Sequence, residues 1–381
     1  MDSWIKIFLV LLEFSAIAYI LIILIFTVGW YRLKEFVSTA SEVKTSLSVI
    51  IAIRNEAGNI LDLLNSIDKQ SLSKKQFEII IVDDASTDDS IDIINAFKKE
   101  HNELQMKVIE SDGNGKKDAL KKAFSEVKNE IVFTTDGDCI LNENLLKNYL
   151  NYFEENHTIK LCFGSVFYEK PNFPLQQIFR VEFASLVASG AGSAGFELPL
   201  MMNAANMAFR LKDYEVVKNK IDGENLSSGD DIFILHAFAK EFGNGSIGFY
   251  KNSEHIVETK APLSIKDFFK QRIRWGSKAK AYKSLWPKLV SLVVFIFNFM
   301  LSATLILSIY KLWFASLYFL FVLLKFLIDM PLNRNFLKYY KKPANFAMFF
   351  LLEFVYPIYI VIAALAPIFF SFSWKDRDLV K

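Results

Sequence analysis

The chain has 381 residues, with 44 basic and 42 acidic side chains and a formal net charge of +2. This near-neutral balance gives no indication of a nucleic-acid partner, because proteins that bind nucleic acid carry a clear basic excess. A hydrophobic fraction of 52%, which includes 37 phenylalanines, indicates contact with lipid. The two cysteines, Cys139 and Cys162, form no C-x-x-C pattern, which argues against a disulfide framework or structural zinc and favours a reducing compartment.

The first apolar segment, residues 8–30, is long enough to cross the hydrocarbon core of a bilayer. It ends at Trp30 and Tyr31 and is followed at once by basic residues, a combination typical of a membrane–water interface. A secretory signal would be shorter and would end in a small-residue cleavage site. We therefore predict a retained transmembrane helix within residues 1–31.

Short β-branched apolar runs alternate with helical patterns through the next part of the chain. The runs occupy residues 46–53, 77–82, 107–110 and 131–134. Continuous runs of this kind are typical of buried parallel strands. Their alternation with helices predicts an α/β domain with a doubly wound, nucleotide-binding layout. Because ligands of such sheets bind at the carboxyl edge of the strands, the polar residues that follow each run are candidate ligand contacts.

Polar residues follow all four runs. In chain order they are Arg54 and Glu56; Asp83 and Asp84; a Gly-Asn-Gly-Lys segment ending at Lys116; and Asp136-Gly137-Asp138. Two common nucleotide loops do not fit these positions. A Walker loop would need glycine at Glu110 and Ser or Thr at Lys117, and a dinucleotide loop would need G-x-G-x-x-G after the first strand.

The pair Asp136 and Asp138 follows the fourth run directly. Two carboxylates separated by one small residue suit a hard divalent cation that grips a diphosphate. The alternative is an acidic turn that caps the next helix, because Asp and Gly are common turn residues. The pair alone does not decide between these two interpretations.

Two later signals lie at Asp230-Asp231, which opens an apolar stretch, and at Gln271-x-x-Arg274-Trp275, inside a strongly basic segment. Between the two halves, residues 173–202 are rich in Phe, Ala, Gly and Met and are compatible with an amphipathic interfacial helix. For the other basic residues of the later segment we expect contact with an anionic membrane surface. These are Lys266, Lys270, Arg272, Lys278 and Lys280.

Three more apolar spans lie at about 289–310, 312–330 and 346–371. Lys325 and Asp329 lie one helical turn apart in the second of these and are expected to pair. The loops next to the spans are basic, and the positive-inside rule therefore places the long middle of the chain in the cytoplasm. We expect an integral protein of a bacterial inner membrane.

The ordered set IAIRNEAGNI, IIIVDDASTDDS, GKKDALKKAF and TTDGDC resembles the inverting family 2 glycosyltransferases of GT-A fold. The Q-x-x-R-W pattern resembles their membrane-bound branch, which includes polysaccharide synthases and ceramide glucosyltransferase-like enzymes. The resemblance covers about residues 46–275. It implies four parts: a transmembrane helix at 1–31, a cytoplasmic GT-A domain at 32–260, a basic interfacial segment at 261–288, and a membrane region of about three spans at 289–381.

The resemblance also implies roles for individual residues. Arg54, Glu56, Asp83, Asp84 and Lys116 are expected to contact the nucleotide, with Asp84 preferred over Asp83 for the nucleobase. Asp136 and Asp138 are expected to bind Mg²⁺ or Mn²⁺, with Asp138 the more direct ligand. Asp231 is the expected catalytic base, and Asp230, Gln271, Arg274 and Trp275 serve the diphosphate and the acceptor. The family motif usually reads Glu-Asp where this chain has Asp230-Asp231. Asn203 and Asn206 are candidates for acceptor contacts, with a turn or cap role as the alternative.

The expected activity is transfer of a hexose or N-acetylhexosamine from a nucleotide sugar to a lipid-linked or glycan acceptor at the membrane. A carboxylate that accepts a hydrogen bond from a uracil N–H favours UDP over GDP. One alternative is a processive polysaccharide synthase that also exports its polymer. Another is an inactive membrane scaffold, which would tolerate loss of Asp138 and Asp231.

Overall fold

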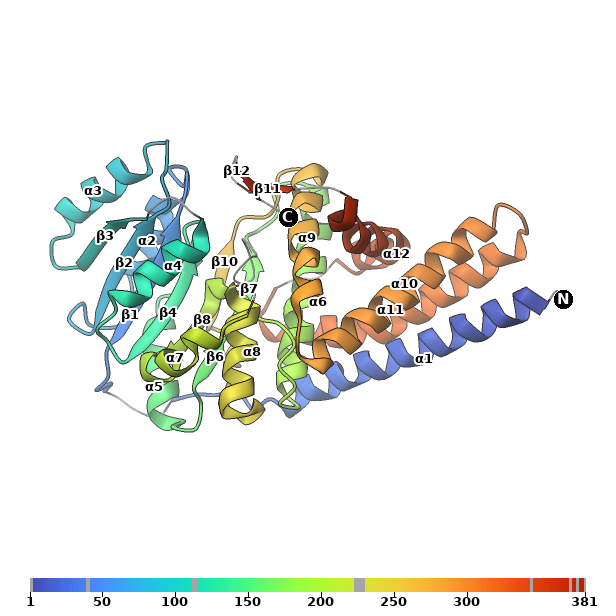
Figure 1. The fold of residues 1–381 in the computed structure, drawn as a ribbon, viewed down its shortest axis with the longest axis horizontal. Helices are drawn as coiled ribbons and strands as arrows, with labels where there is room; N and C mark the ends of the chain where they lie inside the picture. Colours follow the sequence, from blue (N-terminus) through green and yellow to red (C-terminus); the bar gives the residue numbers. More distant parts are fainter. Residues whose placement is uncertain are drawn as a thin grey trace. The chain divides into compact units, whose positions relative to one another are not determined.

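The computed structural model describes residues 3–38, 42–111, 115–222, 230–342, 345–369, 372–374 and 377–379 (Figure 1). It divides into two compact units, and the chain passes between them several times. The sheet unit contains Leu33–Lys170, Met201–Lys260 and Ser373–Lys381. The helical unit contains Met1–Arg32, Pro171–Leu200 and Ala261–Phe372.

A seven-stranded sheet with the order β3-β2-β1-β4-β8-β6-β9 forms the centre of the sheet unit. Its strands are β1 (Leu47–Ile53), β2 (Phe77–Asp83), β3 (Gln105–Glu110), β4 (Ile131–Asp136), β6 (Leu161–Phe163), β8 (Met207–Arg210) and β9 (Ile247–Phe249). The first four strands are parallel, whereas β8 runs antiparallel to β4 and β6. The predicted α/β class is confirmed.

The helices of the sheet unit follow the apolar periodicity of the sequence. They are α2 (Ile60–Asp68), α3 (Ser90–Glu100), α4 (Lys116–Ser125), α5 (Leu145–Glu155), α7 (Leu211–Val217) and α8 (Asp230–Phe242). In α2, for example, Ile60, Leu63, Leu64 and Ile67 share one face and are all buried. This spacing of three and four residues is what packs a helix against a sheet.

The remaining short elements complete the chain. A second sheet has the order β5-β10-β7, from β5 (Cys139–Leu141), β7 (Ser165–Tyr168) and β10 (Ile256–Thr259). Short 3-10 helices are η1 (Ala204–Asn206), η2 (Lys218–Lys220), η3 (Asn244–Ser246) and η4 (Ser277–Ala281), and the strands β11 (Phe372–Trp374) and β12 (Arg377–Leu379) come last. Because Thr259 pairs with Cys139, the second sheet brings the end of β10 beside the turn that follows β4.

Strand register brings the predicted ligand-contact positions to one edge of the large sheet. Ile53 pairs with Asp83, and Ala52 pairs with Asp136. The three strands β2, β1 and β4 are adjacent and parallel, so their carboxyl ends meet. Arg54, the first residue after β1, therefore lies at the same edge as the two aspartates.

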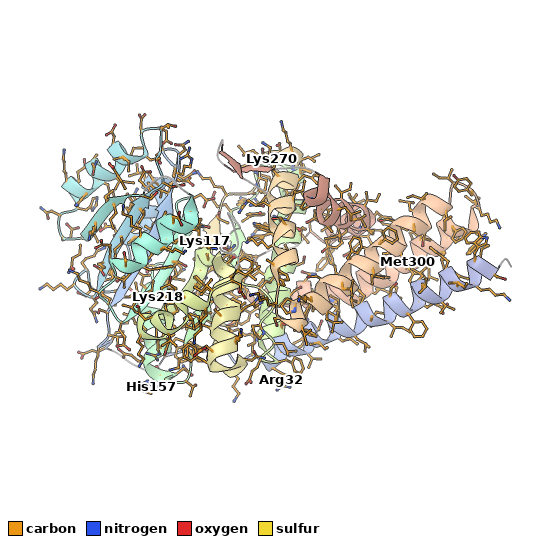
Figure 2. The ribbon with its side chains drawn as sticks, in the orientation of Figure 1. Arg32, Lys117, His157, Lys218, Lys270 and Met300 are labelled. Carbon is orange, nitrogen blue, oxygen red and sulfur yellow. The ribbon has the colours of Figure 1, made fainter. Side chains whose placement is uncertain are left out.

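The described residues of the helical unit form six α-helices. They are α1 (Ser3–Arg32), α6 (Pro174–Ala194), α9 (Ile265–Gly276), α10 (Leu285–Leu307), α11 (Trp313–Tyr339) and α12 (Phe346–Phe369). Within the part of the chain that the structure describes, four helices are long and apolar enough to cross a membrane: α1, α10, α11 and α12. They coincide with the four apolar segments of the sequence. Arg32 lies at the end of α1 (Figure 2). Its guanidinium carbon is 4.4 Å from the ring centroid of Phe196.

The backbones of α1 and α6 touch at glycines. A Cβ atom on Gly29 would lie 1.9 Å from the carbonyl oxygen of Gly192, and one on Gly195 would lie 2.0 Å from the carbonyl oxygen of Gly29. No side chain fits at either position, so glycine is required there. Such close helix contacts are typical of helix packing in membranes. This contact fixes the 171–200 segment to the first apolar helix.

A cluster of charged side chains is buried among α1, α11 and α12. The ammonium of Lys325 donates to Asp329 at 2.7 Å and to Glu353 at 2.6 Å. The hydroxyl of Tyr19 donates to Asp329 at 2.7 Å. The predicted Lys325–Asp329 pair is confirmed, and Glu353 is an additional member from a different helix. One cation therefore faces two carboxyl groups inside the apolar bundle.

Candidate active site

The loops that follow β1 and β2 are joined by Arg54. Its Nη1 donates to the carbonyl oxygens of Asp84 at 2.6 Å and Ala85 at 2.9 Å. The backbone N–H of Asp84 in turn donates to the carbonyl of Ile53 at 2.9 Å. Arg54 is buried. The guanidinium thus fixes the relative position of the two loops.

Asp83 and Asp84 are both buried and both shape the strand-end loops. The carboxylate of Asp83 accepts from the backbone N–H of Ser86 at 3.1 Å. Oδ1 of Asp84 accepts from the Ser111 hydroxyl at 3.0 Å and from the Gly115 N–H at 3.1 Å. Asp84 therefore connects the end of β2 to the segments that follow β3. The exposed fraction is 5% for Asp83 and 1% for Asp84, which makes Asp83 the more accessible of the two.

Glu56 lies against the glycine of the Asp-Gly-Asp segment. A Cβ atom on Gly137 would lie 2.8 Å from Cγ of Glu56 and 3.1 Å from Cγ2 of Ile53. The carboxylate of Glu56 accepts from the side-chain amide of Asn59 at 2.7 Å. Glycine at position 137 is therefore needed for the chain after β4 to pass next to Glu56. This contact places three carboxyl-bearing residues, Glu56, Asp136 and Asp138, around one small residue.

Asp136 and Asp138 have different surroundings. Asp136 forms an ion pair with Lys116, from the first turn of α4. Oδ2 of Asp138 accepts from the hydroxyl of Thr259 at 3.1 Å. Both are hard oxygen donors, and Mg²⁺ sites of this kind use one or two carboxylates together with substrate phosphates. The residues present at this strand end fit a divalent cation in that mode.

Thr259 is a member of this site that the sequence did not indicate. It lies at the end of β10, more than a hundred residues after Asp138, and no local motif marks it. The neighbouring Cys139 is buried, and burial together with the nearby Asp138 carboxylate raises the pKa of its thiol well above the usual value. Cys139 is therefore a buried, protonated thiol that packs in the core, and it does not act as a thiolate nucleophile.

Asp231 lies in the first turn of α8, within the sheet unit. Its Oδ1 accepts from the backbone N–H of Ile232 at 2.8 Å, and the side chain is half-buried. Ile234, one turn further along α8, lines the same small cavity as Lys116 and Asp136. The start of α8 is thereby brought toward the end of β4. The side chain of Asp230 lies outside the described residues.

Gln271, Arg274 and Trp275 all lie on α9, in the helical unit. The expectation that the other basic residues of this segment contact a membrane surface is wrong for Arg272 and Lys278, because both side chains are buried. Lys266 and Lys270 are exposed, as expected. The Lys280 side chain lies outside the described residues.

Asn206 is not an acceptor contact, contrary to the sequence-based suggestion. It is fully buried, its amide nitrogen donates to the carbonyl of Ser165 at 2.9 Å, and its amide oxygen accepts from Tyr149 at 2.8 Å. Asn203 caps η1 by accepting from the Ala205 N–H at 3.0 Å. Asn203 therefore has the cap role, whereas Asn206 links η1 to β7 and α5 in the core.

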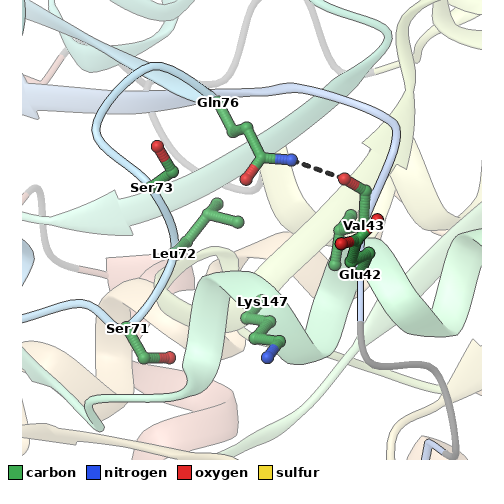
Figure 3. A pocket seen from close by; sticks show the side chains of 7 residues that line it. All are labelled: Glu42, Val43, Ser71, Leu72, Ser73, Gln76 and Lys147. Carbon is green, nitrogen blue, oxygen red and sulfur yellow. Dashed lines mark hydrogen bonds between the residues drawn. The ribbon is translucent and has the colours of Figure 1, made fainter.

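A separate cavity of about 340 Å³ lies near the amino end of β2 (Figure 3). Its lining includes Ser71, Leu72, Ser73 and Gln76, and the Gln76 amide donates to the carbonyl of Val43 at 2.6 Å. Because Gln76 precedes β2 whereas Asp83 ends it, this cavity belongs to the opposite edge of the sheet. It is distinct from the strand-end site.

Comparison with known proteins gives three results. The family description "Glycosyl transferase family 2" matches residues 48–214. The poly-beta-1,6-N-acetyl-D-glucosamine synthase of Staphylococcus epidermidis is 24% identical over 343 residues, which covers 88% of this chain and 77% of that protein. The glycosyltransferase GlyG of Streptococcus pneumoniae is 31% identical over 236 residues, which covers 57% of this chain and 75% of that protein.

The fold also matches a solved structure. The mannosyltransferase PcManGT from Pyrobaculum calidifontis, in complex with GDP-Man and Mn²⁺, aligns with a TM-score of 0.63 at 17% sequence identity. The alignment covers 94% of this chain and 99% of that one. At this identity the likeness shows a shared fold.

Proposed function

Because the chain belongs to glycosyl transferase family 2, we propose that it is a membrane-bound, inverting enzyme that moves a sugar from a UDP-sugar to a lipid-linked or glycan acceptor. The observation that carries the proposal is the strand register, which pairs Ile53 with Asp83 and Ala52 with Asp136. It gathers one guanidinium, one ammonium and several carboxylates at the edge where open α/β sheets bind ligands. This set of charges suits a nucleoside diphosphate with a bound cation.

The strand-end residues divide the work of binding the donor. Arg54 holds the loops after β1 and β2. Asp83 and Asp84 would contact the nucleobase, and Glu56 would line the same nucleotide pocket. Lys116 pairs with Asp136, and its ammonium would contact a phosphate oxygen of the donor. A positive group at this point stabilises the charge that develops on the leaving diphosphate.

Asp136 and Asp138 would hold Mg²⁺ or Mn²⁺. When bound, the cation supplies a positive charge for the departing diphosphate. The two carboxylates would be its ligands, and the hydroxyl of Thr259, which donates to Asp138, would hold that carboxylate in one rotamer. Metal ligands are commonly oriented in this way by a neighbouring group that hydrogen-bonds to them.

Asp231 is the proposed general base, which takes the proton from the acceptor hydroxyl as it attacks the anomeric carbon. It is half-buried in the first turn of α8, and that helix shares a cavity lining with Lys116 and Asp136. On α9, Gln271 and Arg274 would help to bind the diphosphate, and Trp275 would line the acceptor side. Asp230, the first residue of α8, would serve the diphosphate or the acceptor.

The four long apolar helices support a membrane location, and the basic loops between them favour a cytoplasmic sheet unit. An acceptor at the membrane fits this arrangement. Because the similar synthase of Staphylococcus epidermidis is named for N-acetyl-D-glucosamine, UDP-N-acetylglucosamine is the first donor to test.

The test measures UDP release by the purified full-length protein across UDP- and GDP-sugars, with and without membrane lipid extract and EDTA. We expect release from one UDP-sugar that depends on the extract, stops with EDTA and returns with Mn²⁺ or Mg²⁺. Asp231→Asn should lower the rate by roughly 10²- to 10⁴-fold, the usual contribution of a general base. A rate of UDP release that EDTA does not lower, or that Asp231→Asn leaves unchanged, contradicts the mechanism.

A second candidate is processive polymer synthesis. It is favoured by the similarity to a polysaccharide synthase over 343 residues, a length that includes more than the family domain. The length of the product made on the best donor separates the two: a single added sugar supports transfer, and a ladder of long products supports polymerisation.

A further inference from the structure

An ion pair inside the helical unit joins α6, α9 and α12. Arg272 of α9 donates from Nε to both carboxylate oxygens of Glu182 on α6, at 2.9 and 3.0 Å, and also from Nη2. The hydroxyl of Tyr359 on α12 donates to the same carboxylate at 2.8 Å. The exposed fraction is 3% for the Arg272 side chain and 0% for that of Glu182. A planar fork of donors and two carboxylate oxygens give this contact a fixed orientation.

Arg272 also contacts two of the three Q-x-x-R-W residues. Its Nη1 donates to the side-chain oxygen of Gln271. Its guanidinium carbon lies 4.3 Å from the ring centroid of Trp275 and 4.6 Å from that of Phe268. Stacking of a guanidinium on an aromatic face restricts the rotation of both groups. Arg272, which the motif does not specify, is therefore in contact with both Gln271 and Trp275 of the motif.

Helix geometry links this anchor to Arg274. At about 100° per residue, Arg274 lies about 200° around α9 from Arg272, while Lys270 and Arg274 are four residues apart and share one face. Anchoring Arg272 on Glu182 therefore turns Arg274 to the other side of the helix. A rotation of α9 by half a turn would exchange the two arginines.

We propose that Arg272, Glu182 and Tyr359 are positioning residues that set the rotation of α9 and so determine that Arg274, and not Arg272, takes the exposed Lys270 side of the helix. The inference rests on the proposed function, which gives Arg274 its role. Arg272 and Glu182 would have no contact with the reacting groups. They act through the orientation of Gln271, Arg274 and Trp275, and Tyr359 holds the carboxylate from α12.

The experiment uses the full-length protein with Lys270→Cys as a reporter of the face that carries Arg274. Lys270 is exposed on α9 (Figure 2), and the native Cys139 and Cys162 are buried. The labelling rate of the new cysteine by a water-soluble thiol reagent is measured beside kcat, KM for the UDP-sugar and the thermal midpoint. The reporter variant alone sets the reference for all four quantities.

In the reporter background we expect Glu182→Gln to slow the labelling reaction or to divide it into a fast and a slow phase. It should also lower kcat by about 10- to 100-fold, which is the effect of a small misplacement of a binding group. Arg272→Lys, which keeps the charge but loses the fork, should give a smaller loss. The exchanged pair Glu182→Arg with Arg272→Glu should recover labelling and kcat relative to either single change. Tyr359→Phe is the mild variant if the others fail to fold.

The outcomes separate this inference from the proposed function. Arg274→Ala should abolish transfer without changing labelling; if it stays active, the role of Arg274 fails while the labelling of Glu182→Gln still reports on the rotation of α9. If the labelling rate of Glu182→Gln is unchanged and its kcat falls only as far as its thermal midpoint does, the ion pair has a structural role alone. That result overturns the inference. Unchanged labelling and activity overturn it as well.

Discussion

The ammonium of Lys116 and the carboxylate of Asp136 form an ion pair that joins the first turn of α4 to the end of β4. The side chains are 25% and 34% exposed, and a pair in such contact with water adds little to folding stability. Its value is local: the pair keeps a cation and a carboxylate at the strand-end edge, where either group can turn to a ligand. Loss of the Lys116 ammonium should therefore affect ligand binding more than folding stability.

Replacing Lys116 by methionine should lower kcat/KM for the UDP-sugar by roughly 10- to 100-fold, because one charge-assisted contact to the diphosphate is lost. The thermal midpoint should hardly change. Lys107→Met is the matched control, since Lys107 forms an exposed ion pair with Glu126 on the same unit. A similar loss of activity in both variants would argue against a specific role for Lys116.

Asp138→Asn should lower turnover by about 10²-fold or more, and it should raise the Mn²⁺ concentration that gives half-maximal rate, because the amide is a weaker cation ligand. Thr259→Val should give a smaller shift in the same direction, since it removes the hydroxyl that orients Asp138. Asp92→Asn, an exposed change on α3, should leave both quantities unaltered. Metal titration of the initial rate is the measurement.

Gly137→Ala should impair donor binding. The added Cβ would meet Glu56 at 2.8 Å, and relief of that clash moves Glu56 or the turn after β4. Overpacking of this kind costs about 1–3 kcal/mol. Gly58→Ala is the control, because a Cβ atom at that position would have nothing within 4 Å. Isothermal titration with UDP and Mn²⁺ compares the two; equal affinities would show that the space around Gly137 does not matter.

His255 should make the sheet unit sensitive to acid. Burial lowers the pKa of His255 well below its usual value of 6.5, and the rings of Tyr149 and Tyr250 lie 4.3 and 3.8 Å from the imidazole, centroid to centroid. In the folded chain the imidazole is neutral, whereas in the unfolded chain it gains a proton below about pH 6.5. Stability is therefore fully present above this pH and falls as the pH drops below it, by up to about 1.4 kcal/mol per pH unit.

The measurement is the thermal midpoint between pH 5 and 8. His255→Leu removes the titrating group at similar volume and should flatten the acid side of the curve. His157→Leu, at an exposed position, should leave the curve as in the unchanged protein. An unaltered acid slope in His255→Leu would assign the pH dependence to other groups.

Lys325→Met should destabilise the helical unit strongly. It would leave Asp329 and Glu353 facing each other without the cation that both contact, and breaking a buried pair costs about 3–5 kcal/mol. The double change with Glu353→Gln should recover part of the loss, because one carboxylate is then neutral. Lys288→Met on the exposed face of α10 is the control, and heat inactivation in detergent is the readout.

The sequence predicts which residues meet at the strand-end edge, because its signals are local. A β-branched run followed by polar residues defines both a strand and its carboxyl end, and parallel neighbours then bring Arg54, Asp83 and Asp136 to one edge. Arg272 shows the limit. Its basic neighbours indicate a membrane surface, whereas its partner Glu182 lies 90 residues away on α6. Thr259 was missed for the same reason, since its contact with Asp138 comes from the second sheet.

The glycine contact between α1 and α6 also bears on how this enzyme can be dissected. The 171–200 segment interrupts the sheet unit in the chain yet packs with α1 in the helical unit. A fragment limited to residues 33–260 would keep α6 while losing the helix that covers Gly192 and Gly195. Such a truncation would present an apolar, glycine-lined helix to water and should aggregate. A water-soluble form of the sheet unit therefore requires α6 to be replaced by a polar linker between residues 170 and 201.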